Sequence, residues 1–235
     1  MPHALVLSHD WIAHELGHLE AWLDVHGFSV NRVLREQPRA LPPADLLIVL
    51  GSPASVAGDE CPPASLSEVA AVRDWVTSGR PCLGICFGAQ VLALATGGRV
   101  RRMAQPFERY AALDVAAGAP ESIHGPWVVW HNDGIIAPAS SEVLGSLDHA
   151  DLMFRTRRAW GLQPHVEVTA ASLERMAVAL GSPQATYGPI VEQLRADDEA
   201  NAAHARALLD AFLDDTGAGR LRGDEGPGED LPGQR

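Results

Sequence analysis

Lysine is absent from this chain of 235 residues, and all 18 of its basic residues are arginines. The phosphate-binding loop G-x-x-x-x-G-K-[ST] requires a lysine, so the chain cannot contain that loop. Acidic residues number 30, which gives a formal net charge of −12. This charge argues against a nucleic-acid partner, and the basic cluster of Arg99, Arg101 and Arg102 is too small to change that expectation.

Cysteines and long apolar runs are also scarce. Cys61, Cys82 and Cys86 form neither a paired framework nor a C-x-x-C motif, so we expect reduced thiols. The N-terminus has no basic leader before an apolar run, and no stretch approaches the roughly 18 apolar residues of a membrane helix. We therefore expect a cytoplasmic protein that does not bind membranes. The odd cysteine count leaves room for a catalytic thiol.

The first 100 residues alternate between short apolar runs and helical patterns that end at glycines. Strands alternating with helices are typical of a parallel sheet covered on both faces. The sequence therefore predicts an α/β fold with a mainly parallel central sheet. The expected strands are 4–8, 28–34, 45–50 and 81–85, and the expected helices are 11–26, 67–78 and 87–95.

The pattern changes after residue 99 to short extended segments, which predict a small antiparallel extension that includes 111–115 and 127–130. Later elements are expected as a strand over 159–163 and helices near 190–195 and 199–213. Residues 216–235 are rich in glycine, proline and acids, so we expect disorder there. The chain is thus expected to be one domain over 1–215 with an acidic tail. It has no internal repeat.

One cysteine lies where an expected strand turns sharply into an expected helix, in Gly84-Ile85-Cys86-Phe87-Gly88. The two glycines relieve crowding at the turn, and the N-terminus of the following helix favours a thiolate. A cysteine after an apolar strand is also commonly a buried structural residue. The glycine frame favours a nucleophile.

A cysteine nucleophile needs a base that is oriented by a third group. His165 and Glu167 are two residues apart, so in an extended segment their side chains project to the same face. Each of the ten histidines could equally be an ordinary surface residue. Because Cys86 and His165 both follow expected strands, where open α/β sheets place their sites, the three residues together predict Cys-His-Glu catalysis.

These residues resemble the class I glutamine amidotransferases, over roughly residues 4 to 170. The matching segments are Gly51-Ser52-Pro53, the run from Gly84 to Gln90, Trp130-His131-Asn132-Asp133 and residues 161–167. The resemblance implies a flavodoxin-like fold, no cofactor, and hydrolysis of glutamine through a γ-glutamyl thioester. The ammonia released would pass to an acceptor elsewhere.

The resemblance also implies roles for individual residues. Cys86 would attack the carboxamide, His165 would move the proton and Glu167 would hold the imidazole. The oxyanion would be bound by the backbone amide of Phe87 and by one within Gly51-Ser52. Substrate contacts would come from Gln90, Trp130 and His131. An ordinary position in a helix for Gln90, and packing at a strand end for the other two, are the alternatives.

Three positions depart from the family pattern. The segment before the base usually reads Q-F-H-P-E, whereas here Pro164 precedes His165. The usual paired glycines of the oxyanion strand become Gly51-Ser52, so an amide that must flip into place belongs to a less permissive residue. Asn132 stands in a segment that is usually S-H-x-D or W-H-G-D. These changes raise the question of a substrate other than free glutamine.

A competing motif, His14-Glu15-Leu16-Gly17-His18, matches the zinc-binding pattern H-E-x-x-H. It lies on an expected helix, and the only candidate third ligand is the remote Glu36. We therefore interpret the two histidines as solvent-facing and expect no metal site.

Three functions remain open from the sequence. The first is a glutaminase subunit that supplies ammonia to a separate synthetase, because the chain has no phosphate-binding loop of its own. The second is a γ-glutamyl hydrolase that cleaves a γ-glutamyl amide of a small molecule without a partner. The third is a binding or regulatory module without catalysis, which the intact triad argues against.

Overall fold

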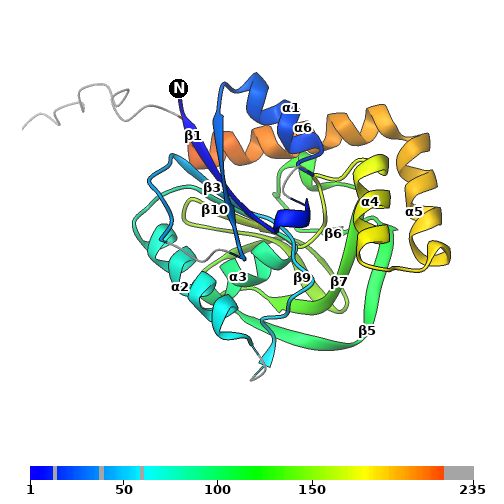
Figure 1. Ribbon diagram of the computed structural model, residues 1–235, viewed down its shortest axis with the longest axis horizontal. Coiled ribbons are helices and arrows are strands. Elements are labelled where there is room, and N and C mark those ends of the chain that lie inside the picture. The colour runs from blue at the N-terminus through cyan, green and yellow to red at the C-terminus, as the bar shows by residue number, and fades with distance from the viewer. Residues whose placement is uncertain (13–14, 37–39, 59–60, 220–235) are drawn as a thin grey trace, which may run out of the picture.

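Eight strands form one central sheet in the computed structural model, which describes residues 1–12, 15–36, 40–58 and 61–219 (Figure 1). They are β1 (His3–Ser8), β2 (Ser29–Leu34), β3 (Leu46–Val49), β4 (Cys82–Ile85), β6 (Asp114–Val115), β8 (Glu142–Leu147), β9 (Ala150–Thr156) and β10 (Ala159–Leu162). Their order is β2-β1-β3-β4-β10-β9-β8-β6, parallel as far as β10 and antiparallel beyond it. The predicted α/β fold with a mainly parallel sheet is confirmed.

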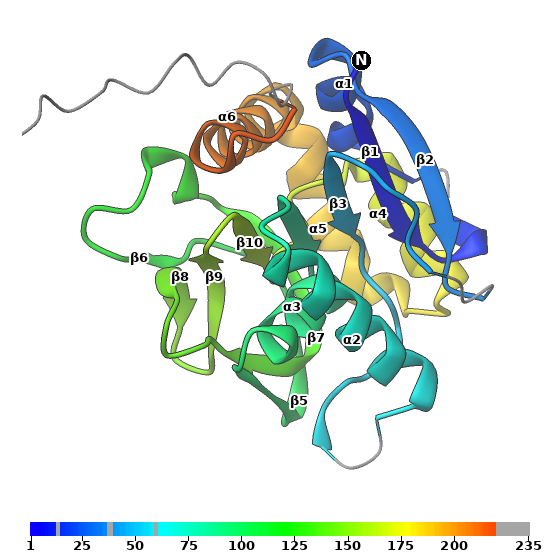
Figure 2. The same ribbon diagram turned by 90° about the vertical axis from the view of Figure 1, so that its left-hand side faces the viewer.

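Helices cover both faces of this sheet. Figure 2 shows α1 (His18–Val25) and α6 (Asp198–Thr216) on one side, and α2 (Pro63–Thr77) and α3 (Phe87–Ala95) on the other. Successive strand residues point to opposite faces. Ala4 and Val6 of β1 accordingly pack with α1 and α6, whereas Leu5 and Leu7 pack with α2 and α3. Burial on both faces explains why the parallel strands are continuous apolar runs.

A second, two-stranded sheet lies beside the central one. It pairs β5 (Arg99–Ala111) with β7 (Trp127–Ile136) in antiparallel register, as expected of an antiparallel extension. Against it packs a helical pair, α4 (Ala170–Ala179) and α5 (Gln184–Ala196), through an apolar cluster that includes Val128. The sequence expectation had no counterpart of α4, which begins with a capping box between Thr169 and Ser172.

Two expected helix starts are wrong. The helix expected over 11–26 is a short 3₁₀ turn, Asp10–Ile12, followed by α1 from His18, with 13–14 outside the described residues. Gly17 separates them, with φ of 51° and the backbone so close to Glu167 that a Cβ would lie 1.9 Å from its carbonyl oxygen. The second start, expected at a Ser67 cap, lies earlier at Pro63, because proline has the φ of a first helical turn.

The expected disordered tail begins too early. Thr216 is the last residue of α6, and Ala218 is buried. The Arg158 guanidinium donates to the carbonyls of Thr216 and Gly217 at 2.6 and 3.2 Å. Residues 220–235 lie outside the described residues. No helix of the described ranges has the length and apolar character to cross a membrane.

Candidate functional site

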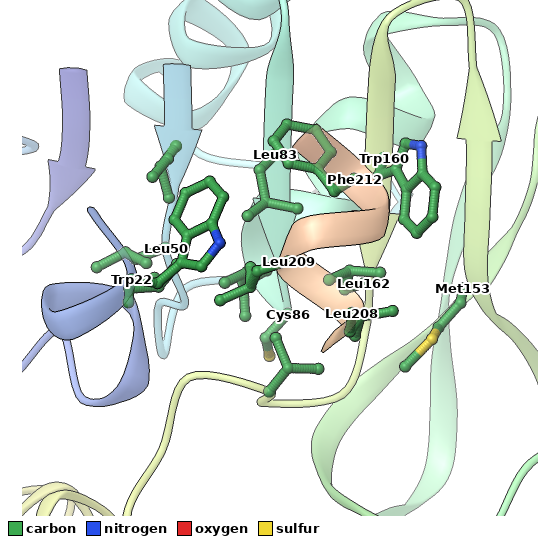
Figure 3. Close-up of a cluster of buried hydrophobic side chains, with 14 of the residues drawn as sticks. Trp22, Leu50, Leu83, Cys86, Met153, Trp160, Leu162, Leu208, Leu209 and Phe212 are labelled. Atoms are coloured by element: carbon green, nitrogen blue, oxygen red, sulfur yellow. The ribbon is translucent and has the colours of Figure 1, made fainter. Parts of the chain in front are cut away.

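Cys86 lies on the turn that joins β4 directly to α3. Its φ of 51° is a left-handed conformation, which is strained for a residue with a side chain. Figure 3 shows Cys86 among the side chains of the buried cluster that contains Leu50 and Leu162. The turn requires close backbone approach, because a Cβ on Gly84 would lie 2.4 Å from the carbonyl oxygen of Gly88.

Gly88 is the tighter of the two flanking glycines, since a Cβ there would lie 1.9 Å from the carbonyl oxygen of Val49. We expect Gly88→Ala to lower the free energy of unfolding by about 1–3 kcal/mol, the usual cost of overpacking, in a urea titration. Gly188→Ala in α5 is the matched control, because the nearest atom to its added Cβ lies 3.8 Å away. That change should stabilise the chain by about 0.5–1 kcal/mol. Equal stability of both variants would contradict the packing account.

His165 and Glu167 follow β10, the parallel neighbour of β4. His165 Nδ1 lies 2.8 Å from Glu167 Oε1, which leaves Nε2 for Cys86, and both side chains are buried. His165 is further fixed by its backbone amide, which donates to the Val128 carbonyl at 2.7 Å. Pro164 before the histidine therefore leaves the pair within hydrogen-bond distance.

The electrostatics favour a charged imidazole. Burial alone would lower the pKa of His165, but the negative charges of Glu167 and Cys86 and their hydrogen bonds raise it well above 6.5. Glu167 Oε2 is buried and, within the described residues, has no hydrogen-bond partner. The carboxylate charge is thus directed mainly at His165. Glu167 and Cys86 thus both favour the protonated form of His165.

A buried glutamine, which the sequence reasoning missed, also contacts the sulfur. Gln163 Nε2 donates to Cys86 Sγ at 3.5 Å, and Sγ lies 3.6 Å from the Trp130 carbonyl oxygen. Gln163 lies within the segment that carries His165, yet only its complete burial marks it as more than a spacer. Its amide restricts where the sulfur can lie.

The two segments expected to bind an oxyanion both lie beside Cys86. Phe87 is the first residue of α3, so its backbone N–H is not used by the helix. A Cβ on Gly51 would lie 3.1 Å from His165 Cε1 and 3.8 Å from Cys86 Cβ, which places this backbone directly against the pair. Ser52 lines the same cavity as Cys86. The amides of Phe87 and Ser52 remain the predicted donors.

The cavity beside Cys86 has a volume of about 270 Å³ and is bordered by all three predicted substrate-contact residues. Gln90 is buried, and its Nε2 donates to the Asp133 carbonyl at 3.2 Å and to Gln163 Oε1 at 3.3 Å. His131 Nδ1 donates to the same carbonyl at 2.9 Å, and burial lowers the pKa of His131 to about 4. His131 is therefore neutral at pH 7. Trp130 contributes the carbonyl near the sulfur.

Charged groups to which the sequence reasoning assigned no role in the site line another part of the cavity. Arg102 Nη1 lies 3.1 Å from the buried carboxylate of Asp133, whose other oxygen accepts from Ser55 Oγ at 2.5 Å. Glu108 also borders the cavity. Residue types alone gave no signal for these contacts, because the pairing of β5 with β7 brings them together.

The zinc-type motif is divided by the structure. His14 lies outside the described residues, Glu15 pairs with Arg175 at 2.7 Å, and His18 is the first residue of α1. Burial lowers the pKa of His18, although the charges of Asp198 and Glu167 oppose this shift. In the part of the chain that the structure describes, no group of three or more potential metal ligands is assembled.

Comparisons with known proteins show which sequences and folds this chain resembles. A GMP synthase (glutamine-hydrolysing) of Bifidobacterium longum is 31% identical over 156 residues, 63% of this chain and 27% of that protein. One of Thermomicrobium roseum is 38% identical over 138 residues, 54% and 24% of the two proteins. The chain thus spans about a quarter of the length of these curated relatives.

The crystal structure of a glutamine amidotransferase from Thermotoga maritima has a similar fold, with a TM-score of 0.77. It is 20% identical, and the match covers 90% of this chain and 98% of that one. The model of the family "glutamine amidotransferase class-I" matches residues 8–177. Because this match covers well over half of the 235 residues, the chain belongs to the class I glutamine amidotransferase family.

Proposed function

We propose that this chain hydrolyses the side-chain amide of glutamine and supplies the ammonia to a separate biosynthetic protein. The observation that carries the proposal is the buried His165, which Glu167 holds at 2.8 Å and whose pKa is raised by Glu167 and Cys86. A thiolate beside an imidazolium is the combination that amide cleavage needs, because the sulfur attacks and the imidazolium protonates the leaving amine.

The reaction runs in two halves. Cys86 Sγ bonds to the carboxamide carbon, and the resulting oxyanion is stabilised by backbone amides of Phe87 and Ser52. His165 Nε2 gives its proton to the amide nitrogen and the C–N bond breaks. Ammonia is released, and the γ-glutamyl group remains bound to Cys86 as a thioester. Water then gives a proton to His165 and attacks the thioester. Glutamate leaves, and the thiolate and imidazolium are restored.

The cavity suits the other end of glutamine. The guanidinium of Arg102 and the carboxylate of Glu108 border one cavity, so an amino acid with both charges finds both counter-charges. Gln90 Nε2 is occupied by Asp133 and Gln163, which leaves its oxygen to accept from the substrate amide. We assign these residues to substrate binding on this basis, together with Trp130 and His131.

The acceptor of ammonia belongs to another protein in this proposal. The chain has no lysine for a phosphate-binding loop. We expect a partner that activates the acceptor, and glutaminase activity that rises when the partner is present.

A γ-glutamyl hydrolase is the second candidate, and one observation favours it. Four apolar residues of α4 and its C-cap line the same cavity as the charged groups: Leu173, Met176, Ala177 and Leu180. Ammonia needs no such surface, whereas an organic amine on the γ-carboxyl would bury its carbon atoms there. This hydrolase would act without a partner.

Product analysis separates the two candidates. Purified chain is incubated with glutamine, or with γ-glutamyl amides of alkyl and aryl amines, and glutamate, ammonia and free amine are measured. The first proposal predicts glutamate and ammonia from glutamine. Amine release with glutamine left intact would replace it with the second, and glutamate from neither substrate would contradict both.

A further inference from the structure

A buried arginine holds the backbone where the second oxyanion donor is expected. Arg35 Nη1 donates to the Gly51 carbonyl at 2.9 Å, and Nη2 donates to the Leu50 carbonyl at 2.7 Å. Its Nε pairs with Glu68 at 3.0 Å, and the two side chains are only 8% and 10% exposed. In a trans peptide the N–H points opposite to the preceding C=O, so fixing the Gly51 carbonyl also fixes the Ser52 N–H.

The same guanidinium reaches the other expected donor segment. It lies 5.0 Å from the centroid of the Phe87 ring, a cation–π distance. Phe87 follows the nucleophile directly, so Arg35 contacts both segments that border Cys86. Its position immediately after β2 makes this arrangement rigid, because β2 pairs with β1 along its whole length.

A second anchor acts on the Ser52 side chain. Ser52 Oγ lies 2.7 Å from His9 Nε2, and His9 Nδ1 lies 2.6 Å from Glu36 Oε1. Glu36 Oε2 accepts from the Asp10 amide at 3.1 Å, and Ser52 Oγ accepts from the Ala54 amide at 3.0 Å. His9 Nδ1 donates to the carboxylate, and Nε2 lies within hydrogen-bond distance of the serine hydroxyl. These contacts link the Ser52 side chain through His9 to the carboxylate of Glu36.

The residues around His9 support this assignment. Burial opposes ionisation of Glu36, but its hydrogen bonds to His9 and to backbone amides outweigh burial and lower the pKa of Glu36. Glu36 is therefore a carboxylate that requires a donor. The His9 ring also stacks on Trp11, with centroids 6.0 Å apart. His9 is held on three sides.

We propose that Arg35 and His9 are positioning residues that fix the Gly51–Ser52 peptide, so that the Ser52 amide is preset for the oxyanion formed by attack of Cys86. This rests on the proposed function. The two anchors also explain how a serine can replace a glycine at this position, since the hydroxyl is used to hold the loop. Both anchors lie within this chain.

Ser52, His9 and Glu36 are linked by hydrogen bonds in the order Ser-His-Glu, which is also the arrangement that activates a serine nucleophile. The observations favour positioning, because Ser52 Oγ already accepts from Ala54 N–H and the same residue carries the expected oxyanion amide. Reaction with a fluorophosphonate distinguishes the two roles, because that reagent labels activated serines.

The test compares Ser52→Ala and His9→Phe with wild type, and includes Ser52→Thr because it keeps the hydroxyl. Removing an oxyanion donor commonly costs about 10²- to 10³-fold in kcat, so loosening one should lower kcat about 10- to 100-fold. KM should change less than about twofold, because ground-state binding does not use the oxyanion. Alkylation of Cys86 by iodoacetamide forms no oxyanion, so its rate should stay at the wild-type value. Ser52→Thr should retain most of kcat.

Each outcome decides between accounts. If the wild type is active and kcat is unchanged in both Ser52→Ala and His9→Phe, the positioning role is overturned but the proposed function is not. The same holds if the rate of Cys86 alkylation falls in these variants as much as kcat does. Fluorophosphonate labelling of Ser52 in Cys86→Ala would replace it with a nucleophilic role. Arg35→Lys, which keeps the charge beside Glu68 but cannot bind both carbonyls equally, should show the same kcat loss. Wild type that alkylates normally yet cleaves no γ-glutamyl amide would overturn the proposed function and this inference together.

Discussion

Replacing Cys86 with alanine should lower the rate of glutamine hydrolysis by on the order of 10⁴-fold or more, because no other group in the site can form the thioester. The rate is measured as ammonia release from purified chain. Folding should be retained, since Cys86 contributes only one small side chain to a large apolar cluster. Near-wild-type hydrolysis by a folded variant would contradict nucleophilic catalysis at this residue.

The chain offers a matched thiol as control. Cys61 is half-buried and lies outside the cavity, so Cys61→Ser should hydrolyse glutamine at the wild-type rate. Cys82 is a poorer control, because it is completely buried in the core and its replacement would leave a cavity there. Loss of activity in Cys61→Ser would indicate that the cysteine assignment is wrong.

Glu167→Gln should have the second largest effect, lowering kcat by about 10²- to 10⁴-fold with little change in KM. The glutamine keeps the size of the side chain but removes the charge that, with Cys86, raises the pKa of His165. The imidazole would then lose both its orientation and much of its proton. Steady-state kinetics measure the first effect.

Histidine NMR titration measures how readily His165 loses its proton. The pKa of His165 should be lower in Glu167→Gln than in the wild type. The raised pKa of His165 also makes the stability of the fold depend on pH. Protonation of His165 stabilises the folded chain fully below about pH 6.5, the ordinary pKa of histidine. This contribution is lost as the pH rises through the higher pKa of His165 in the folded chain. The stability difference between wild type and Glu167→Gln should therefore be larger at about pH 6 than at alkaline pH. An unchanged titration would show that Glu167 does not control His165.

The residues predicted to carry the chemistry could be picked out from the sequence because local rules mark them. The glycines around Cys86 are required by backbone contacts of 2.4 Å or less to any added Cβ, which is why the turn has a recognisable pattern. His165 and Glu167 are close in sequence, so their side-chain pairing needs no long-range information. The parallel pairing of β4 and β10 then brings the two segments together. Their catalytic roles remain predictions.

The contacts around Ser52 and Arg35 could not be predicted, because they join residues that are far apart in the sequence and belong to no recognisable motif. His9, Glu36 and Ser52 come from three separate loops, 27 and 43 residues apart, and nothing in their local sequence indicates that they meet. Arg35 is one of 18 arginines, and only the fold shows that its guanidinium binds two carbonyls beside the site. The shortened α1 has a similar cause, because Gly17 must pass the Glu167 backbone.

The proposed function depends on attack by Cys86 on a γ-glutamyl carbonyl. A diazo-ketone analogue of glutamine tests it most directly, because it alkylates the nucleophile only after binding as the substrate does. Wild-type chain is treated with the analogue, with and without excess glutamine, and the modified residue is located by peptide mass mapping. The account predicts one adduct, on Cys86, which glutamine prevents and which is absent in Cys86→Ser. An unlabelled Cys86 in a folded chain, or an adduct on Cys61 instead, would contradict it.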